Sequence, residues 1–344
     1  MKYVKQIIGS LQNCYSMTEL PVCGETRLLV ASEKRFPCFM FSESGTLLDT
    51  VWEEPGGVMT MVPVPGKDGV FLATQCFYSP NDSAEAKLVC VTKTEKGPWE
   101  TTIIAELPFV HRFDIIERNG VSHIIACTLK SGHEYKNDWR FPGKVFVGVL
   151  GNDPKQPLAL SPIAEGLGHN HGYTRFEKDG TVSGVISSDE GVFLLTPPAQ
   201  PDAQWTIRKL YSEPCSDAIL IDLNHDGKLE LVTISPFHGD KLSICEDRNG
   251  VFVPVYMYPE PLPFLHSIFG GSVYGRATVY IGNREGERLF LGLFYDDDAG
   301  KYATEEVDRG CGSTNCMLFR RNDRPALLSA NREINEIAIY DIYE

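Results

Sequence analysis

The sequence predicts an all-β fold, a seven-bladed β-propeller in which residues 1–344 form a single domain. Three observations lead to this prediction. The 344 residues include 31 glycines and 22 prolines, which occur along the whole chain and indicate many short elements joined by tight turns. A two-strand motif recurs seven times. Successive copies are separated by about the length of one four-stranded blade.

Each copy of the motif is a strand, a turn rich in Gly, Asp and Asn, and a second, more apolar strand. Two further strand-like runs follow, as at 241–245 and 251–257 in the fifth repeat. The first residues of the seven copies lie 45, 52, 60, 46, 49 and 49 residues apart, and they are Cys14, Met59, His111, His171, Asp217, His266 and Asn315. Four antiparallel strands per unit of about 49 residues are typical of a propeller blade.

The two ends of the chain are predicted to close the ring together. The seventh copy leaves room for only three strands before Glu344. A predicted outer strand at 4–7 ends seven residues before Cys14, just as the segment 207–210 ends seven residues before Asp217. We therefore expect the N-terminal strand to complete the last blade, which removes an open sheet edge that would favour aggregation.

The inner end of the first strands is the predicted metal site. These seven residues should form a ring around the channel mouth, and three of the eight histidines of the chain fall among them. His111, His171, Asp217 and His266 come from four consecutive blades and form a ligand set suited to a divalent transition metal such as Zn, Mn, Fe or Co. The alternative is a metal-free plug of polar side chains hydrogen-bonded to each other and to water.

Loops on the same face as this ring are expected to form a polar cup. His133, Tyr135 and His238 are the predicted proton-transfer residues, because imidazole titrates near neutral pH and a nearby cation lowers the pKa of a phenol. Which of them is the base is left open. Residues predicted to bind a hydroxyl-rich ligand, through hydrogen bonds or ring packing, are Arg35, Lys130, Trp139, Arg284 and Arg332. Each loop charge could instead simply be solvated.

A turn on the opposite face resembles a calcium loop. It predicts a structural calcium ion held by Asp222, Asn224, Asp226, the backbone carbonyl of Lys228, and Glu230. The turn lacks the last glutamate of an EF-hand, because Thr233 stands there, and is more similar to the short calcium hairpin of FG-GAP-type propeller repeats. The other copies keep only hairpin turns such as 119–120.

Composition excludes some partners. The net charge of -14 disfavours nucleic acid and membrane surfaces and is expected to favour cations and neutral polyols over anionic substrates.

The first residues lack the apolar core of a signal peptide, and no run is long enough to span a membrane, so we expect a cytoplasmic protein. Its ten cysteines form no CxxC pair and are expected to be reduced thiols. The oligomeric state is left open.

Three short segments resemble the propeller domain of aldos-2-ulose dehydratases: 111–114 (HRFD), 126–132 (ACTLKSG) and 168–172 (GHNHG). The resemblance implies an enzyme that acts on 1,5-anhydrofructose or a related keto-sugar. The cupin domains of the fungal members are absent from this sequence, which weakens the case for their isomerase activity.

The predicted activity is that of a metal-dependent carbon–oxygen lyase acting on a keto-sugar such as 1,5-anhydrofructose or a 3-keto-glycoside. Elimination next to a ketone needs a Lewis acid that stabilises an enediolate, a base for the α-proton and an acid for the leaving oxygen. Two alternatives stay open: a metal-dependent sugar isomerase or epimerase, and a noncatalytic propeller that binds carbohydrate or protein.

Overall fold

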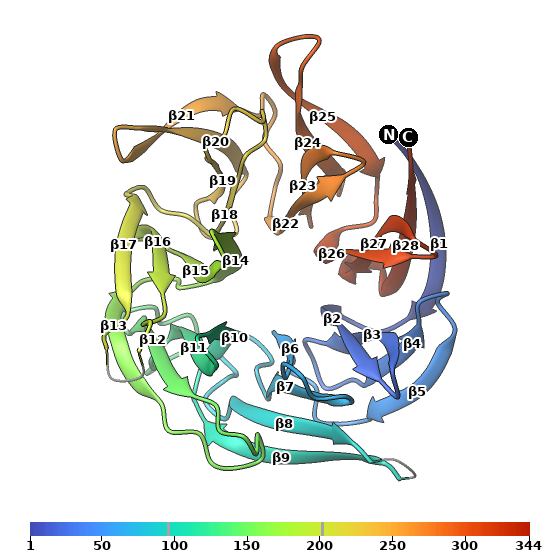
Figure 1. Cartoon of the computed structure of the whole chain (residues 1–344), viewed down its shortest axis with the longest axis vertical. Helices are drawn as coiled ribbons and strands as arrows, with labels where there is room; N and C mark the ends of the chain where they lie inside the picture. Colours follow the sequence, from blue (N-terminus) through green and yellow to red (C-terminus); the bar gives the residue numbers. More distant parts are fainter. Residues whose placement is uncertain (95–96, 201–202) are drawn as a thin grey trace.

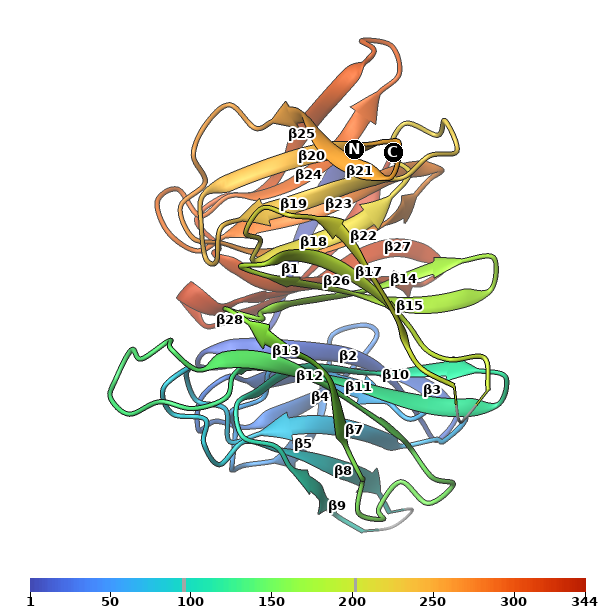
Figure 2. The same ribbon diagram turned by 90° about the vertical axis from the view of Figure 1, so that its left-hand side faces the viewer.

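The computed structural model describes residues 1–94, 97–200 and 203–344. Seven four-stranded antiparallel sheets surround a central opening, so the predicted all-β, seven-bladed propeller is confirmed (Figure 1). Viewed from the side, the loops that join the strands gather at the two faces of the ring (Figure 2). The seven repeats of the sequence correspond to the two innermost strands of the seven blades.

Each blade consists of four strands that follow one another from the inside of the ring outward. The first three blades are β2 (Cys14–Val22), β3 (Glu25–Ser32), β4 (Cys38–Ser42) and β5 (Leu47–Trp52); β6 (Met61–Pro63), β7 (Val70–Gln75), β8 (Lys87–Lys93) and β9 (Trp99–Glu106); β10 (Val110–Arg118), β11 (Val121–Lys130), β12 (Pro142–Val149) and β13 (Ser161–Leu167). The fourth and fifth are β14 (Gly172–Lys178), β15 (Thr181–Ser188), β16 (Gly191–Thr196) and β17 (Thr206–Tyr211); β18 (Asp217–Ile221), β19 (Glu230–Ser235), β20 (Lys241–Arg248) and β21 (Val251–Met257). The sixth and seventh are β22 (Leu265–Val273), β23 (Arg276–Asn283), β24 (Phe290–Asp296) and β25 (Lys301–Asp308); β26 (Ser313–Arg321), β27 (Arg324–Asn331), β28 (Glu336–Tyr343) and β1 (Lys2–Ser10), with a 3-10 turn, η1 (Arg332–Ile334), between β27 and β28.

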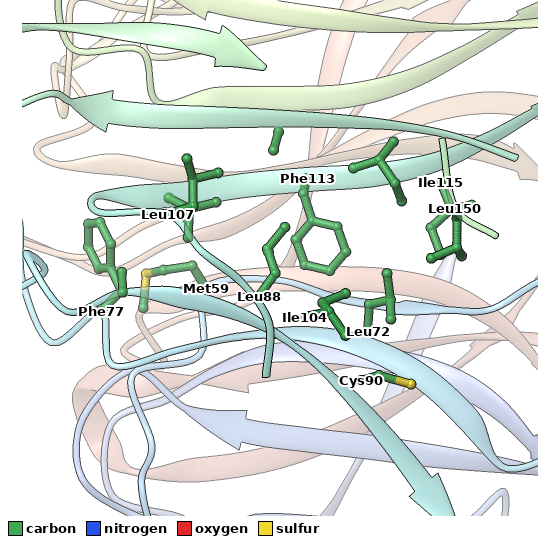
Figure 3. Packing of buried hydrophobic residues seen from close by; sticks show 14 of the residues in the cluster. Met59, Leu72, Phe77, Leu88, Cys90, Ile104, Leu107, Phe113, Ile115 and Leu150 are labelled. Carbon is green, nitrogen blue, oxygen red and sulfur yellow. The ribbon is translucent and has the colours of Figure 1, made fainter. Parts of the chain in front are cut away.

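The second strand has the largest share of buried residues in every blade except the first, where β2 and β3 are buried to a similar extent. In β11, for example, eight successive residues after Ser122 are buried, whereas most of the outer strand β17 is exposed. A strand covered on both faces reads as a continuous apolar run, and this explains why the second strand was the most apolar part of each repeat. Apolar side chains then pack between neighbouring blades, as Leu72 and Leu88 of the second blade do against Phe113 of the third (Figure 3).

The ring closes as the sequence predicts. Strand β1 pairs antiparallel with β28, with Lys2 opposite Tyr343, and so forms the outer strand of the seventh blade. The two termini lie side by side (Figure 1). The Nζ atom of Lys5 lies 2.8 Å from Asp308 of the sixth blade and 2.7 Å from Glu336 of the seventh. The N-terminal strand therefore joins two blades as well as completing one.

All ten cysteines lie in the described part of the chain, and each is a free thiol. Burial raises the pKa of several of them, for example that of Cys127 to about 12, so these thiols stay protonated at neutral pH. Within the described residues, no helix has the length and apolar character needed to cross a membrane.

Candidate functional site

β-Bulges interrupt the inner strands of four blades near the channel mouth. In the first strands of the first, third, sixth and seventh blades the pairing register skips one residue, and the skipped residues are Tyr15, His111, His266 and Thr314. A bulge leaves one residue unpaired and re-aims its side chain, and bulges are common beside active sites. The ring therefore contains Tyr15 where the sequence suggested its neighbour Cys14, since a one-residue insertion cannot be read from an apolar pattern. In the seventh blade Asn315, the residue that the sequence suggested, does line the central channel.

The ring histidines donate their Nδ1 hydrogens to the next blade. His111 Nδ1 lies 3.1 Å from the carbonyl oxygen of His171, and His266 Nδ1 lies 2.8 Å from that of Thr314. His171 Nδ1 lies 2.9 Å from Oδ2 of Asp217. When Nδ1 of a neutral imidazole is a donor, Nε2 keeps its lone pair. Histidines that bind metals are commonly held in this way by a carbonyl or carboxylate behind them.

His171, His238 and His266 form a candidate metal-ligand cluster, a group whose side chains could together hold a metal ion. One ligand nitrogen from each lies within 4.8 Å of the others. The Nε2 atom of His171 is buried and, in the described structure, has no hydrogen-bond partner. An unpaired buried nitrogen costs free energy unless a ligand satisfies it. Three imidazoles with one unsatisfied nitrogen fit a divalent transition metal with open coordination positions.

This cluster differs from the predicted ligand set of His111, His171, Asp217 and His266. Asp217 stands behind His171 and accepts its Nδ1 hydrogen, so it orients a ligand. His111 packs on His171, with ring centroids 4.6 Å apart, but is not part of the three-histidine group. His238, predicted for proton transfer, comes from the β19–β20 loop and joins the group because its ring packs 5.0 Å from that of His171.

Burial keeps most of these imidazoles neutral. It is the main cause that lowers the pKa of His111, His238 and His266 well below 6.5, and the positive charges of nearby groups lower these pKa values further. Neutral imidazole is the form that binds a metal. His238 also has a positive φ of 49°, a sparsely populated conformation for a residue with a side chain, and such strain is concentrated at functional sites.

The three histidines line a cavity of about 190 Å³ on this face of the ring. Its wall is largely apolar and includes Met59, Phe77, Leu129, Phe237 and Phe264. Its polar groups, besides the histidines, are Tyr15, Glu33, Lys34, Tyr78, Ser79 and Arg284. The Tyr15 hydroxyl lies 3.3 Å from Nε2 of His266, and burial raises the pKa of this phenol. On the other side of the ring, Asp217, His266 and Met59 also line a channel of about 440 Å³.

A chain of ion pairs borders the cavity across the sixth, seventh and first blades. Arg284 Nε lies 2.7 Å from Glu333, and Arg332 lies 2.8 Å from the same carboxylate. Arg332 also pairs with Glu33. Lys34 Nζ is 3.6 Å from Glu33 and donates to the carbonyl of Tyr78. Of the predicted binding residues, Arg284 thus lines the cavity, whereas Arg332 is engaged by ion pairs with Glu33 and Glu333.

The remaining predicted residues lie outside the cavity wall. His133 and Tyr135 are exposed on the β11–β12 loop, where His133 packs on Phe109 and Arg140 lies over the Tyr135 ring. The structure therefore does not bring these two proton-transfer candidates to the cavity. The conformation of the loop is set by Asp138, whose carboxylate accepts the backbone N–H groups of Glu134 and Arg140 and pairs with the Arg140 side chain.

Lys130, Trp139 and Arg35 have packing roles. Lys130 is 1% exposed, and its Nζ donates to Asn81 and to the Asp138 carbonyl, so it is not free to hold a sugar hydroxyl. Trp139 packs on His169 with ring centroids 4.2 Å apart. Arg35 stacks 3.7 Å above the ring of Tyr78, which itself lines the cavity.

In the predicted calcium loop, backbone N–H groups of the loop itself donate hydrogen bonds to the side-chain oxygens that were expected to bind calcium. The N–H groups of Gly227, Asp226 and Lys228 donate to side-chain oxygens of Asp222, Asn224 and Asp226, respectively. Glu230 is buried and accepts the N–H of Leu223 at 2.7 Å. In the described chain these carboxylates do not gather into a group of metal-ligating atoms. The calcium site stays a prediction that this arrangement of oxygens does not favour.

Sequence reasoning gave no role to four residues that line the cavity, which are Tyr15, Glu33, Lys34 and Tyr78. Tyr15 was hidden by the bulge, which moves the ring position from Cys14 to its neighbour. The only available signal was that loops after the second strand lie on the same face as the start of the first. That rule correctly places Lys34, Tyr78, His238 and Arg284 around one cavity.

No family model and no curated protein matches the sequence. Among solved structures, the chain is similar to the β-propeller domain of Cps50 (Swd1) from Myceliophteria thermophila, with a TM-score of 0.63 and 9% sequence identity. The match covers 99% of this chain and 100% of that domain. At this identity the similarity shows the fold, a β-propeller, and the resemblance to aldos-2-ulose dehydratases and to FG-GAP repeats stays a prediction.

Proposed function

We propose that this protein is a metal-dependent carbon–oxygen lyase whose metal is held by His171, His238 and His266. The observation that carries the proposal is the buried Nε2 atom of His171, which has no partner in the described structure, on a ring whose centroid lies 5.0 Å from that of His238 and 5.2 Å from that of His266. When bound, a divalent metal would supply a Lewis acid that polarises a carbonyl oxygen of the substrate. The substrate class, a keto-sugar, is the one that the sequence resemblance implies.

Two residues of the cavity suit the proton transfers of an elimination. The α C–H and β C–O bonds break, a C=C bond forms, and the leaving oxygen takes up a proton. Tyr15 is fitted to donate that proton, because burial raises the pKa of its phenol and keeps it protonated. His111 is fitted to accept the α-proton, because its Nδ1 hydrogen is donated to the His171 carbonyl and Nε2 keeps a lone pair.

A second candidate is a noncatalytic propeller whose histidines plug the channel without a metal. It is favoured by the 3.3 Å contact between the Tyr15 hydroxyl and Nε2 of His266, because this hydrogen bond satisfies that nitrogen. A metal-dependent isomerase or epimerase would use the same cluster without loss of the β-oxygen. The two catalytic candidates differ only in their product.

The test combines metal analysis with a product assay. We expect about one transition-metal ion per chain after loading with Zn, Mn or Co, and a conjugated enone, followed by ultraviolet absorbance, with at least one keto-sugar of a panel. His171→Ala should lose both the metal and the activity. The matched control His225→Ala removes an exposed histidine on a turn at the other face and should keep both. A wild-type protein that binds no transition metal would overturn the proposal, and isomer formation without an enone would favour the isomerase.

A further inference from the structure

We propose that the ligand of this cavity carries a carboxylate group, and that Arg284 binds it. The inference rests on the proposed function, because the metal held by the three histidines would be the second contact of the ligand. It narrows the substrate class from keto-sugars in general to sugar acids. It departs from the expectation, drawn from the net charge, that neutral polyols are preferred.

The guanidinium of Arg284 is held in place by its neighbours, but only one of its three nitrogens donates a hydrogen bond in the described structure. Its side chain is 11% exposed and lines the cavity. Its Nε donates to Glu333 at 2.7 Å, and its plane lies 4.3 Å from the centroid of the Phe264 ring. In the described part of the chain, its two terminal nitrogens, Nη1 and Nη2, have no hydrogen-bond acceptor, and neither is fully buried. A planar fork of free N–H donors held in place by stacking matches a carboxylate.

The charge along this edge of the cavity is positive. The ion-pair chain of Arg284, Glu333, Arg332, Glu33 and Lys34 contains three cations and two anions, so it carries one net positive charge. Its two ends, Arg284 and Lys34, are cations that line the cavity. Among the described residues, Glu33 is the only acidic side chain of the cavity wall, and it is already engaged by Arg332 and Lys34. An anionic ligand thus meets an attractive field here, although the whole protein is acidic.

Arg284 and the metal-ligand cluster share one aromatic support. The Phe264 ring contacts Arg284 at 4.3 Å and the His238 imidazole at 4.5 Å. A single small ligand can therefore reach the cluster with one polar group and Arg284 with its carboxylate. This places the anionic end of the ligand toward the sixth blade.

The test uses two probes that differ only in one carboxylate, D-glucuronate and D-glucose, titrated calorimetrically into metal-loaded protein. We expect glucuronate to bind at least about ten-fold more tightly than glucose, since a charge-assisted bidentate pair is among the stronger hydrogen-bonded contacts. Arg284→Gln should bring the two affinities to within about two-fold. Arg284→Lys, which keeps the charge but loses the fork, should restore only part of the difference. Circular dichroism and the melting temperature establish that both variants are folded.

The matched control is Arg309→Gln, which removes an arginine of the same blade that pairs with Glu287 and Glu306 outside the cavity. It should keep the full preference for glucuronate. Equal affinities of the wild type for the two probes, binding of neither, or a preference that survives in Arg284→Gln would overturn the inference. Repeating the titration with metal-free protein separates the two proposals, because a failure to bind metal leaves the preference that depends on Arg284 measurable.

Discussion

Asp217 is the residue whose position tells most about how the cluster is built. Its carboxylate is 4% exposed and accepts the Nδ1 hydrogen of His171, which fixes the ring orientation and directs Nε2 toward the cavity. A carboxylate behind a histidine raises the basicity of the ligand nitrogen and holds one tautomer. Asp217 is therefore a positioning residue, and the sequence could show only that an acid belongs to the ring.

We predict that Asp217→Asn weakens transition-metal binding about 10- to 100-fold without unfolding the protein, because the amide can still occupy the site but loses the negative charge. A competition titration against a chelator of known affinity measures the change. Asp179→Asn, at a hairpin tip with a positive φ of 52° that asparagine also adopts, is the control and should leave the affinity unchanged. An unaltered affinity in Asp217→Asn would mean that His171 is held by its other contacts.

At the scale of the strands, β1 is held both by its pairing with β28 and by Lys5, which contacts Asp308 of β25. Burial opposes ionisation of the Asp308 carboxyl, but hydrogen bonds from Lys5 and Tyr340 outweigh it and hold its pKa below the usual value. The ionised carboxylate thus stabilises the junction between the sixth and seventh blades.

This junction should weaken in acid. Because the pKa of Asp308 is lower in the folded protein than in the unfolded chain, its contribution is present above about pH 4 and is lost as the pH falls through the folded-state value. We predict that Asp308→Asn lowers the free energy of unfolding by up to about 1 kcal/mol at pH 7, and that the difference between wild type and variant shrinks as the pH falls below about 4. Thermal unfolding over this pH range measures the difference. A difference in unfolding free energy that stays constant until the protein unfolds in acid would exclude a role for the ionised carboxylate.

For the whole ring, closure by β1 should be a condition of stability. We predict that deletion of residues 1–9 lowers the melting temperature by about 5 °C or more and promotes aggregation, because it exposes the edge of β28. Lys5→Gln is the control, since it removes the ion pairs and keeps the strand, and it should cost about 1 kcal/mol or less. A truncated protein that melts like the wild type would show that three strands suffice for the seventh blade.

The sequence predicted the ring better than the chemistry of its centre, for physical reasons. The blade repeat and the closing strand follow from apolar periodicity and turn residues, which are local. The site depends on features that periodicity does not carry. One is the bulge that puts Tyr15 in place of Cys14, and another is the fold of the β11–β12 loop around Asp138, which turns His133 and Tyr135 outward. Which imidazoles converge was likewise decided by tertiary packing, so His238 replaced His111 in the cluster.

The bulges on the inner strands provide positions whose side chains differ between blades while the ring of blades stays the same. Thr314 of the seventh blade occupies the same bulged position as His266 of the sixth, and both are almost fully buried. The sheet needs only an unpaired residue there, and most side chains of the cores between blades come from other positions, although the bulged Tyr15 also belongs to one of these cores. The bulged positions are therefore equivalent places in the fold at which the side chain can differ from blade to blade. Substituting the residue at one of them would change the chemistry of the centre while the ring is kept.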